Sequence, residues 1–368
     1  MKRIALNGRF TSNKQPTGMH KAAFRLFDQI LRRNRDFEFV VFADSLFPGV
    51  KAWERLPNII LVETPFQDWS KSHGHLWEQL QLSRLCEHFG CSLAHHPITT
   101  SPARKSKCKS VVTLHDLSYY RHPEWYSRTY RAGYSACATR GLKHADRVVT
   151  VSNYVFTQAQ DFLRIPGDRL RMVHNGAIPL PPPSSVVESR APYILCVDAL
   201  NPQKNLTRLI RAFQILRKEF KELELYLMGQ PQPGTSKTDA RLAKLKDSRG
   251  VWKLGYLSEV ELADAYARAA VFCYPSLEEG FGLPVLEALY MGTPVVTSNT
   301  SSLPEIAGPC SVLIDPLSVE AIAEGLRQAL HFTTHQRNYF AQQGREWTTR
   351  FSWTAAADAY LKIYAELI

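Results

Sequence analysis

The stretch that decides the fold is C-Y-P-S-L-E-E-G-F-G-L-P-V-L-E-A-L-Y-M-G, residues 273–292. The stretch begins within a short apolar strand (residues 271–274). The strand pattern ends at Pro275, and the chain then passes through a loop bracketed by glycines, residues 280–282. A helix is expected to begin near Pro284, because proline is pre-set for a first helical position and lacks only an N–H that would have no partner there. The pattern predicts a strand, a tight loop and a helix in succession.

The loop of this stretch ends where free backbone N–H groups and the positive end of a helix dipole gather, which is a site for an anion. Two carboxylates flank it, Glu279 before the loop and Glu287 one turn into the helix. Backbone N–H groups can hold a phosphate while each carboxylate accepts hydrogen bonds from neutral hydroxyls. A phosphate beside a polyol suggests a sugar nucleotide.

Strand and helix patterns alternate along both halves of the chain, which predicts parallel βαβ units in an α/β protein with two doubly wound, Rossmann-like domains. We expect strands in the first half at residues 4–7, 39–42, 59–62, 92–94, 111–114 and 148–151. We expect strands in the second half at residues 193–197, 223–228, 251–254, 271–274, 294–297 and 312–314.

A proline-rich segment separates the two halves. Residues 179–185 read P-L-P-P-P-S-S, which favours a semi-rigid extended linker. We therefore place a first domain at residues 1–178, a linker at 179–190 and a second domain at 191–352. Two doubly wound domains predict a ligand cleft at the carboxyl ends of their strands.

The bulk composition limits the class of protein. The chain has 368 residues, of which 45% are hydrophobic and 21% charged, and this is typical of a soluble globular protein. The start of the chain turns polar too soon for a signal peptide, and no apolar run reaches the length of a membrane span. Seven scattered cysteines without a C-x-x-C pair indicate reduced thiols and a cytoplasmic protein.

The net charge of +11 is unevenly distributed. Residues 1–178 hold 26 Lys and Arg against 14 Asp and Glu, or +12, and the remainder has 19 against 20, or −1. A basic half can face nucleic acid or an anionic membrane surface, or it can be a solvated face without a partner.

Three further positions combine a strand end or a helix start with a suitable side chain. Lys204 lies between a strand end and a helix start, from which its ammonium can reach a diphosphate. Gly18 opens a helix and lets the backbone approach a phosphate closely. His115, followed by Asp116, ends a strand of the first half, from which its imidazole can hydrogen-bond a sugar.

No metal site is expected. No two aspartates stand two positions apart, so the D-x-D arrangement that holds a divalent metal on a sugar diphosphate is missing. The histidine pairs His73/His75 and His95/His96 lack further ligands at metal-binding spacing. A leaving diphosphate would then be stabilised by Lys204, loop N–H groups and a helix dipole.

On these motifs the chain resembles glycosyltransferase family four, retaining enzymes with the GT-B fold, and within it a bacterial mannosyltransferase-like group. The most specific motif is E-G-F-G-L-P-V-L-E-A, residues 279–288. Supporting motifs lie at residues 16–18, 113–118, 122–125, 151–153, 173–176, 202–206 and 254–258. The resemblance covers nearly the whole length and implies a C-terminal helix, residues 353–368, that crosses back to the first domain.

The resemblance also implies a role for each site residue. Glu279 would hold the transferred sugar, Glu287 the ribose, and Lys204 the diphosphate. Backbone at the loop and helix start would contact the sugar and phosphates. Gly18 would approach the diphosphate, and His115 would contact the donor sugar. The substrate-binding set is Gly18, Asp116, Tyr256, Gly280, Phe281, Gly282, Leu283 and Glu287, and the catalytic set is His115, Lys204 and Glu279.

The sequence departs from the family pattern at two places. Asp198-Ala199 stands where the family often has Gly-Arg or Gly-Thr, and Gln203 stands where it often has Arg. Lost cationic or hydroxyl contacts there would leave more of the diphosphate binding to Lys204.

The expected function is the transfer of a hexose from a nucleotide sugar, with mannose from GDP-mannose as the first choice, and without a cofactor. The acceptor would be a lipid-diphosphate-linked, lipopolysaccharide or exopolysaccharide glycan, and the basic first half leaves open a peripheral contact with the inner face of the cytoplasmic membrane. Alternatives are a UDP-sugar or deoxyhexose transferase, an epimerase or phosphorylase on the same fold, and a non-enzymatic basic binder. Nucleic acid is not expected as a partner, because nucleic-acid binding would leave residues 279–292 unexplained.

Overall fold

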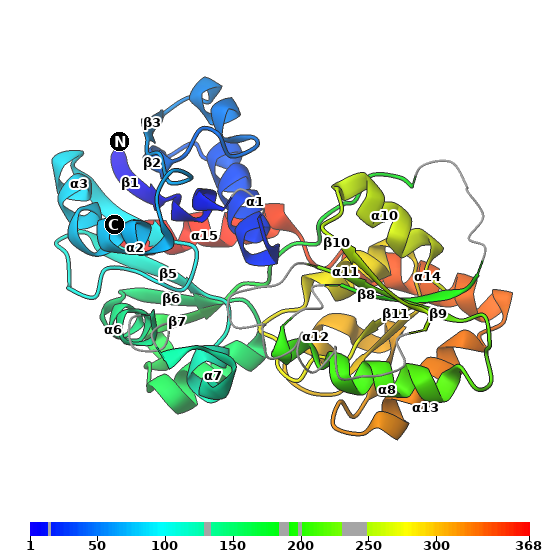
Figure 1. Cartoon of the computed structure of the whole chain (residues 1–368). Coiled ribbons are helices and arrows are strands. Elements are labelled where there is room, and N and C mark those ends of the chain that lie inside the picture. The colour runs from blue at the N-terminus through cyan, green and yellow to red at the C-terminus, as the bar shows by residue number, and fades with distance from the viewer. Residues whose placement is uncertain (14–15, 129–133, 184–190, 198–200, 230–248) are drawn as a thin grey trace. The chain divides into compact units, whose positions relative to one another are not determined.

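The computed structural model of the chain describes residues 1–13, 16–128, 134–183, 191–197, 201–229 and 249–368 (Figure 1). The chain forms two compact units. Unit 1 consists of Met1–Pro123, Ser127–Gly176 and Phe351–Ile368, and unit 2 consists of Glu124–Tyr126 and Ala177–Arg350. Each unit is built around one parallel sheet, so the predicted α/β class with two Rossmann-like domains is confirmed.

The sheet of unit 1 has seven strands in the order β3-β2-β1-β4-β5-β6-β7, and every pair of neighbours is parallel. The strands are β1 (Lys2–Asn7), β2 (Phe37–Ala43), β3 (Ile59–Glu63), β4 (Cys91–His96), β5 (Lys109–Leu114), β6 (Arg147–Thr150) and β7 (Leu170–Met172). The order reverses between β1 and β4. In an open α/β sheet, ligands bind outside the carboxyl ends of the strands at such a reversal.

Helices of unit 1 connect these strands, and a further one comes after the strands of unit 2 in the chain. They are α1 (Gly18–Arg33), α2 (Lys71–Leu80), α3 (Leu82–His88), α4 (Ser118–Arg121), α6 (Ala136–His144), α7 (Asn153–Leu163) and α15 (Trp353–Leu367). Ser152 and Ser352 cap α7 and α15 by accepting a hydrogen bond from the N–H three residues on.

The last helix, α15, belongs to unit 1, as the family resemblance implies. It packs against α1, where Arg33 and Asp358 form an ion pair of 2.7 Å. The chain approaches the start of α15 so closely at Gly176 that an added Cβ would lie 2.4 Å from Trp353. A glycine at position 176 therefore permits the helix to dock.

The sheet of unit 2 has six parallel strands in the order β10-β9-β8-β11-β12-β13, which reverses between β8 and β11. The strands are β8 (Tyr193–Cys196), β9 (Glu224–Met228), β10 (Val251–Gly255), β11 (Val271–Tyr274), β12 (Val295–Ser298) and β13 (Ser311–Ile314). Its helices are α8 (Leu206–Leu216), α10 (Glu259–Arg268), α11 (Leu283–Met291), α12 (Leu303–Ala307), α13 (Val319–Leu330) and α14 (Thr334–Thr348).

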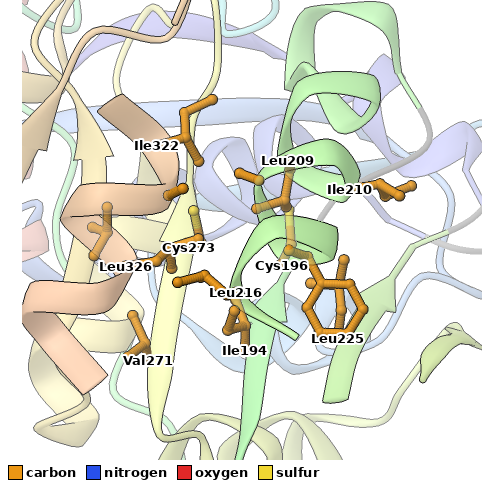
Figure 2. Close-up of a cluster of buried hydrophobic side chains, with 14 of the residues drawn as sticks. Ile194, Cys196, Leu209, Ile210, Leu216, Leu225, Val271, Cys273, Ile322 and Leu326 are labelled. Atoms are coloured by element: carbon orange, nitrogen blue, oxygen red, sulfur yellow. The ribbon is translucent and has the colours of Figure 1, made fainter. Parts of the chain in front are cut away.

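The core of unit 2 fixes the strands whose ends carry the site. Figure 2 shows side chains of α8 and α13, among them Leu209 and Leu326, meeting Ile194 of β8 and Val271 of β11 on one face of the sheet. These side chains are almost completely buried. Burying a large aliphatic side chain contributes about 1.5–3 kcal/mol, so this cluster holds β8 and β11 together firmly.

No helix in the described part of the chain is both long and apolar enough to cross a bilayer.

Candidate active site

The carboxyl ends of β8 and β11 bring Lys204 and Glu279 together in unit 2. Lys204 follows β8, Glu279 follows β11, and these strands are neighbours where the strand order reverses. Lys204 Nζ donates to Glu279 Oε1 at 2.6 Å and to the hydroxyl of Tyr274 at 2.5 Å. Both members of the ion pair are buried, with 7% and 8% of the residue surface exposed.

The loop after β8 is folded by its own side chains. Asn201 Oδ1 accepts from the N–H of Gln203 and starts the short helical turn Pro202–Lys204. Asn205 follows with a φ of 60°, a left-handed conformation that asparagine tolerates better than most residues. The Asn205 amide donates to the carbonyls of Pro275 and Pro316, so it joins the β8 loop to the loops after β11 and β13.

The loop that carries Glu279 is held from α12 and by its own glycine. Ser302 Oγ lies 3.0 Å from the carbonyl oxygen of Glu279 and 2.8 Å from that of Phe281. Gly282 has a φ of 109°, which side chains with a Cβ rarely adopt, and it opens α11. The hydroxyl of Ser276, at the start of this loop, is buried without a hydrogen-bond partner among the described residues.

Glu287 lies in the second turn of α11 and is likewise buried. Its Oε2 accepts a hydrogen bond of 2.9 Å from the hydroxyl of Tyr266 in α10. The two carboxylates are thus both oriented by a partner, Glu279 by Lys204 and Glu287 by Tyr266.

The remaining predicted residues of unit 2 fall into two groups. Gly280, Phe281 and Leu283 are buried with Gly282 around the start of α11, beside Glu279 in the chain. Tyr256 is exposed after the edge strand β10. Strand β10 lies three strand positions from β11, and neighbouring strands are about 4.8 Å apart, so Tyr256 is separated from β11 by roughly 14 Å.

The predicted residues of unit 1 have local partners. Gly18 is the first residue of α1, and the hydroxyl of Thr17 contacts His20 Nδ1 at 2.7 Å instead of capping the helix. Asp116 Oδ1 accepts from the N–H and the hydroxyl of Ser118, so this carboxylate is held at the first residue of α4.

His115 follows β5 and is bonded to backbone. Its Nε2 donates to the carbonyl of Pro97 at 2.7 Å, which makes Nδ1 the acceptor nitrogen of the neutral ring. Burial lowers the pKa of His115 below its ordinary value, so the ring is neutral at pH 7.

Sequence reasoning missed the residues that orient the charged pair. Gln203, which stands where the family often has Arg, is buried, and its side-chain amide donates to the carbonyl of Glu278. In this chain the position therefore braces the loop after β11. No local sequence pattern predicts the hydrogen bonds of Gln203, Asn205 and Ser302, because their partners lie 75, 70 and 23 residues away in the chain. The other departure, Asp198-Ala199, lies outside the described residues.

Among the residues that the structure describes, no three His, Cys, Asp or Glu side chains come together as a group that could hold a metal ion.

Two family models match the chain, and together they span almost all of it. "Glycosyltransferase Family 4" matches residues 14–178, and "Glycosyl transferases group 1" matches residues 182–347. The second match contains Lys204, Glu279 and Glu287, and the first contains Gly18, His115 and Asp116.

Curated relatives include two named mannosyltransferases. O-antigen chain mannosyltransferase B of Escherichia coli is 28% identical over 268 residues, which cover 70% of this chain and 70% of the relative. MMP alpha-(1->4)-mannosyltransferase of Mycolicibacterium hassiacum is 29% identical over 282 residues, which cover 74% of this chain and 64% of the relative.

Solved structures share the fold across the whole chain. Sucrose-phosphate synthase of Thermosynechococcus elongatus superposes with a TM-score of 0.78 at 18% identity, covering 100% of this chain and 99% of that one. WaaG, a glycosyltransferase involved in lipopolysaccharide biosynthesis, gives 0.71 at 16% identity and covers 99% of each chain. At these identities the likeness concerns the fold, which is the predicted GT-B arrangement.

Proposed function

Because the chain belongs to the glycosyltransferases, with a family 4 domain followed by a group 1 domain, we propose that it transfers mannose from GDP-mannose to a glycan hydroxyl. The acceptor in this proposal is a lipid-linked, lipopolysaccharide or exopolysaccharide glycan. The reaction retains the anomeric configuration and uses no metal ion.

The observation that carries the proposal is the buried Lys204–Glu279 pair beside the start of α11. The pair is neutral as a whole, so a diphosphate that arrives here meets no net repulsion. Pro284 has no N–H and the N–H of Val285 donates to the carbonyl of Gly282, so the groups that favour an anion here are the N–H of Leu283, the helix dipole and Lys204. Glu279, held by Lys204, is oriented to accept from sugar hydroxyls.

The transfer step balances without a covalent intermediate on the protein. The bond between the anomeric carbon and the diphosphate oxygen breaks, and the acceptor oxygen forms its bond to the same face of that carbon. The acceptor proton passes to the leaving diphosphate. Lys204 and the helix start stabilise the charge that develops on the diphosphate, and Glu279 stabilises the positive charge on the sugar ring.

The remaining roles follow the same assignment. Glu287, oriented by Tyr266, accepts from the ribose hydroxyls. His115 presents Nδ1 as an acceptor to the donor sugar, and Gly18 offers backbone to the diphosphate. Mannose is chosen because O-antigen chain mannosyltransferase B and MMP alpha-(1->4)-mannosyltransferase, the two relatives above, bear that sugar in their names.

A donor panel tests the choice of sugar and nucleotide. We expect the purified chain to release GDP from GDP-mannose, and to release little nucleotide from UDP-glucose, UDP-galactose or a deoxyhexose nucleotide. Release of UDP without GDP would show that the donor is a UDP-sugar and not GDP-mannose. Release of no nucleotide from any donor would overturn the proposed function.

Glu279→Gln tests the site. The substitution keeps the size of the side chain and removes the charge that faces the sugar, so we expect kcat to fall about 100-fold or more. Glu222→Gln, an exposed carboxylate of the same unit, is the matched control and should leave kcat unchanged. Near-normal turnover in Glu279→Gln would contradict the assignment.

Two further measurements address the mechanism. NMR of the first-formed product should show the anomeric configuration of the donor sugar. The rate of transfer in excess EDTA should stay within about twofold of the untreated rate, since Lys204 and the start of α11 stabilise the leaving diphosphate in place of a metal ion. An inverted product or a rate abolished by EDTA would refute the respective statement.

A further inference from the structure

The carboxyl edge of the unit 1 sheet carries a second cluster of buried charged groups, at its own strand-order reversal. The reversal lies between β1 and β4, whose last residues are Asn7 and His96. It is the position in unit 1 that corresponds to the β8/β11 position of Lys204 and Glu279 in unit 2. Because α/β sheets bind ligands at such reversals, the chemistry of this cluster indicates what unit 1 binds.

The centre of the cluster is an ion pair between Arg9 and Glu78. Arg9 Nε lies 3.3 Å from Glu78 Oε1, and the same oxygen accepts 2.7 Å from the Asn7 amide. Arg9 Nη2 donates to Thr100 Oγ1 at 2.6 Å. The Glu78 side chain has no exposed surface, so the pair is fixed inside the unit.

One oxygen of Glu78 is left over. Among the described residues, Glu78 Oε2 is buried without a partner at hydrogen-bond geometry, and Arg9 and the nearby Thr100 hydroxyl help to lower the pKa of this carboxyl. His75, one turn earlier on α2, places its Nδ1 3.9 Å from this oxygen. His75 keeps 35% of its side chain exposed, so it is the member of the cluster that a ligand can reach.

The backbone at the same edge is strained. Thr99 has a φ of 59°, which is rare for a β-branched residue, and the N–H of Thr100 donates to the carbonyl of Ile98 across it at 2.6 Å. This turn holds two hydroxyls in place. Thr99 Oγ1 accepts from the N–H of His115, and Thr100 Oγ1 accepts from Arg9.

From this geometry we propose that His75, positioned by Glu78, binds a hydroxyl of the acceptor glycan. The inference rests on the proposed function and names the acceptor-binding residue that it requires. His75 Nδ1–H points to Glu78 Oε2, and Nε2 accepts the hydroxyl. The Nδ1–Oε2 separation shortens when the acceptor binds, as such contacts often do between ligand-free and liganded enzymes.

The charges of the cluster favour a neutral ligand. Arg9 and Glu78 cancel one another. Burial, assisted by the charge of Arg9, lowers the pKa of His75 to about 4, so its ring is neutral at pH 7. A neutral imidazole beside a charge pair that cancels can accept a hydrogen bond from a sugar hydroxyl.

The test measures acceptor and donor dependence separately. The purified full chain is given its best donor and a set of phenyl glycosides of mannose, glucose and galactose as acceptors. We expect His75→Ala to raise the acceptor KM about tenfold, the loss of one hydrogen bond, and to leave the donor KM within twofold. His75→Asn keeps an acceptor atom on the side chain and should recover part of the loss.

The neighbouring histidine provides the control. His73 lies two residues away on α2 and is exposed, so His73→Ala should change neither KM. Glu78→Gln should raise the acceptor KM and leave kcat largely unchanged, because Glu78 acts through His75. If Glu78 had only a structural role, the substitution would instead lower the release of nucleotide and the transfer to the acceptor together.

The outcomes separate this inference from the proposed function. An unchanged acceptor KM in His75→Ala, or a wild type that releases nucleotide but transfers to none of the glycosides, overturns the role of His75 alone. Failure to release nucleotide from any donor overturns the proposed function.

Discussion

At the scale of single residues, Lys204 and Glu279 depend on one another for stability as well as for chemistry. Each buried charge is compensated by its partner at 2.6 Å. Removing one partner of a buried pair strands the other charge and costs about 3–5 kcal/mol, whereas removing both costs much less.

The two residues should therefore show strong coupling in a double-mutant cycle. We expect Lys204→Met to destabilise unit 2 by about 3 kcal/mol, and Lys204→Met/Glu279→Gln to be more stable than Lys204→Met alone. Urea unfolding followed by tryptophan fluorescence measures both. Additive effects of the two substitutions would show that the pair is not coupled.

Buried histidines of unit 1 make the protein sensitive to acid. Burial lowers the pKa of His96 to about 4 and that of His95 well below its ordinary value. Between about pH 6.5 and 4 the unfolded chain binds protons there that the folded chain does not, so stability falls as the pH falls.

The expected slope is up to about 1.4 kcal/mol per pH unit for each such histidine. Denaturant unfolding at pH 7, 6 and 5 measures it, above the range in which most carboxylates titrate. His96→Gln should show a shallower slope than the wild type. A stability that stays constant from pH 7 to 5 would contradict the neutral state of these rings.

The sequence predicted Lys204 and Glu279 as site residues because both follow recognisable strand-to-helix junctions. The residues that orient them could not be predicted in the same way, since Gln203 and Ser302 act on carbonyls of a distant loop. In the sequence, His75 is recognisable only as half of an H-x-H pair. The role of its partner Glu78 could not be predicted either, because it depends on the buried ion pair with Arg9, which lies 69 positions earlier in the chain.

At the scale of elements, α15 is fixed to the unit 1 sheet by a chain of hydrogen bonds. The hydroxyl of Tyr364 is hydrogen-bonded to His95 Nδ1 at 2.6 Å, and His95 Nε2 lies 2.9 Å from Thr113 Oγ1. Thr113 Oγ1 is in turn 2.7 Å from the hydroxyl of Tyr360. All four residues are buried.

Removing one hydroxyl from this network should cost more than removing an exposed ion pair at the same interface. We expect Tyr364→Phe to destabilise the protein by about 1–3 kcal/mol, because it leaves His95 Nδ1 buried without a partner. Arg33→Ala, which breaks the exposed pair with Asp358, should cost less than about 1 kcal/mol. Thermal unfolding of the two variants side by side decides it, and equal losses would contradict the ranking.

Elements were more predictable than contacts. The alternation of strand and helix patterns predicted both sheets, and the family resemblance implied the terminal helix. Its attachment to unit 1 came from the family resemblance, since no periodicity shows which sheet a helix at the end of a chain will cover. The His95 network explains the attachment after the fact, through partners 247 and 269 residues apart.

At the scale of the whole molecule, the charge difference between the two halves predicts where a membrane would bind. Residues 1–178 carry +12, and their exposed basic side chains include Arg104, Lys105 and Lys107. Attraction to an anionic leaflet is worth about 1 kcal/mol for each basic residue near the surface and is screened by salt.

We therefore expect the chain to sediment with vesicles containing phosphatidylglycerol, and to be released by about 0.5 M salt. Neutral phosphatidylcholine vesicles are the control and should not retain it. Replacing the three basic residues named above by Ser should weaken retention. Equal retention on neutral and anionic vesicles would contradict an electrostatic contact.

The return of α15 to unit 1 has a consequence for the synthesis of the chain on the ribosome. The surface of unit 1 that contacts Tyr360 and Tyr364 stays uncovered until α15 has been synthesised, and by then the six strands of the unit 2 sheet have already been made. Unit 1 of the nascent chain therefore keeps apolar surface exposed until α15 docks on it. Stalled chains that end before Phe351 should expose unit 1 to protease and to chaperones while unit 2 is already protected.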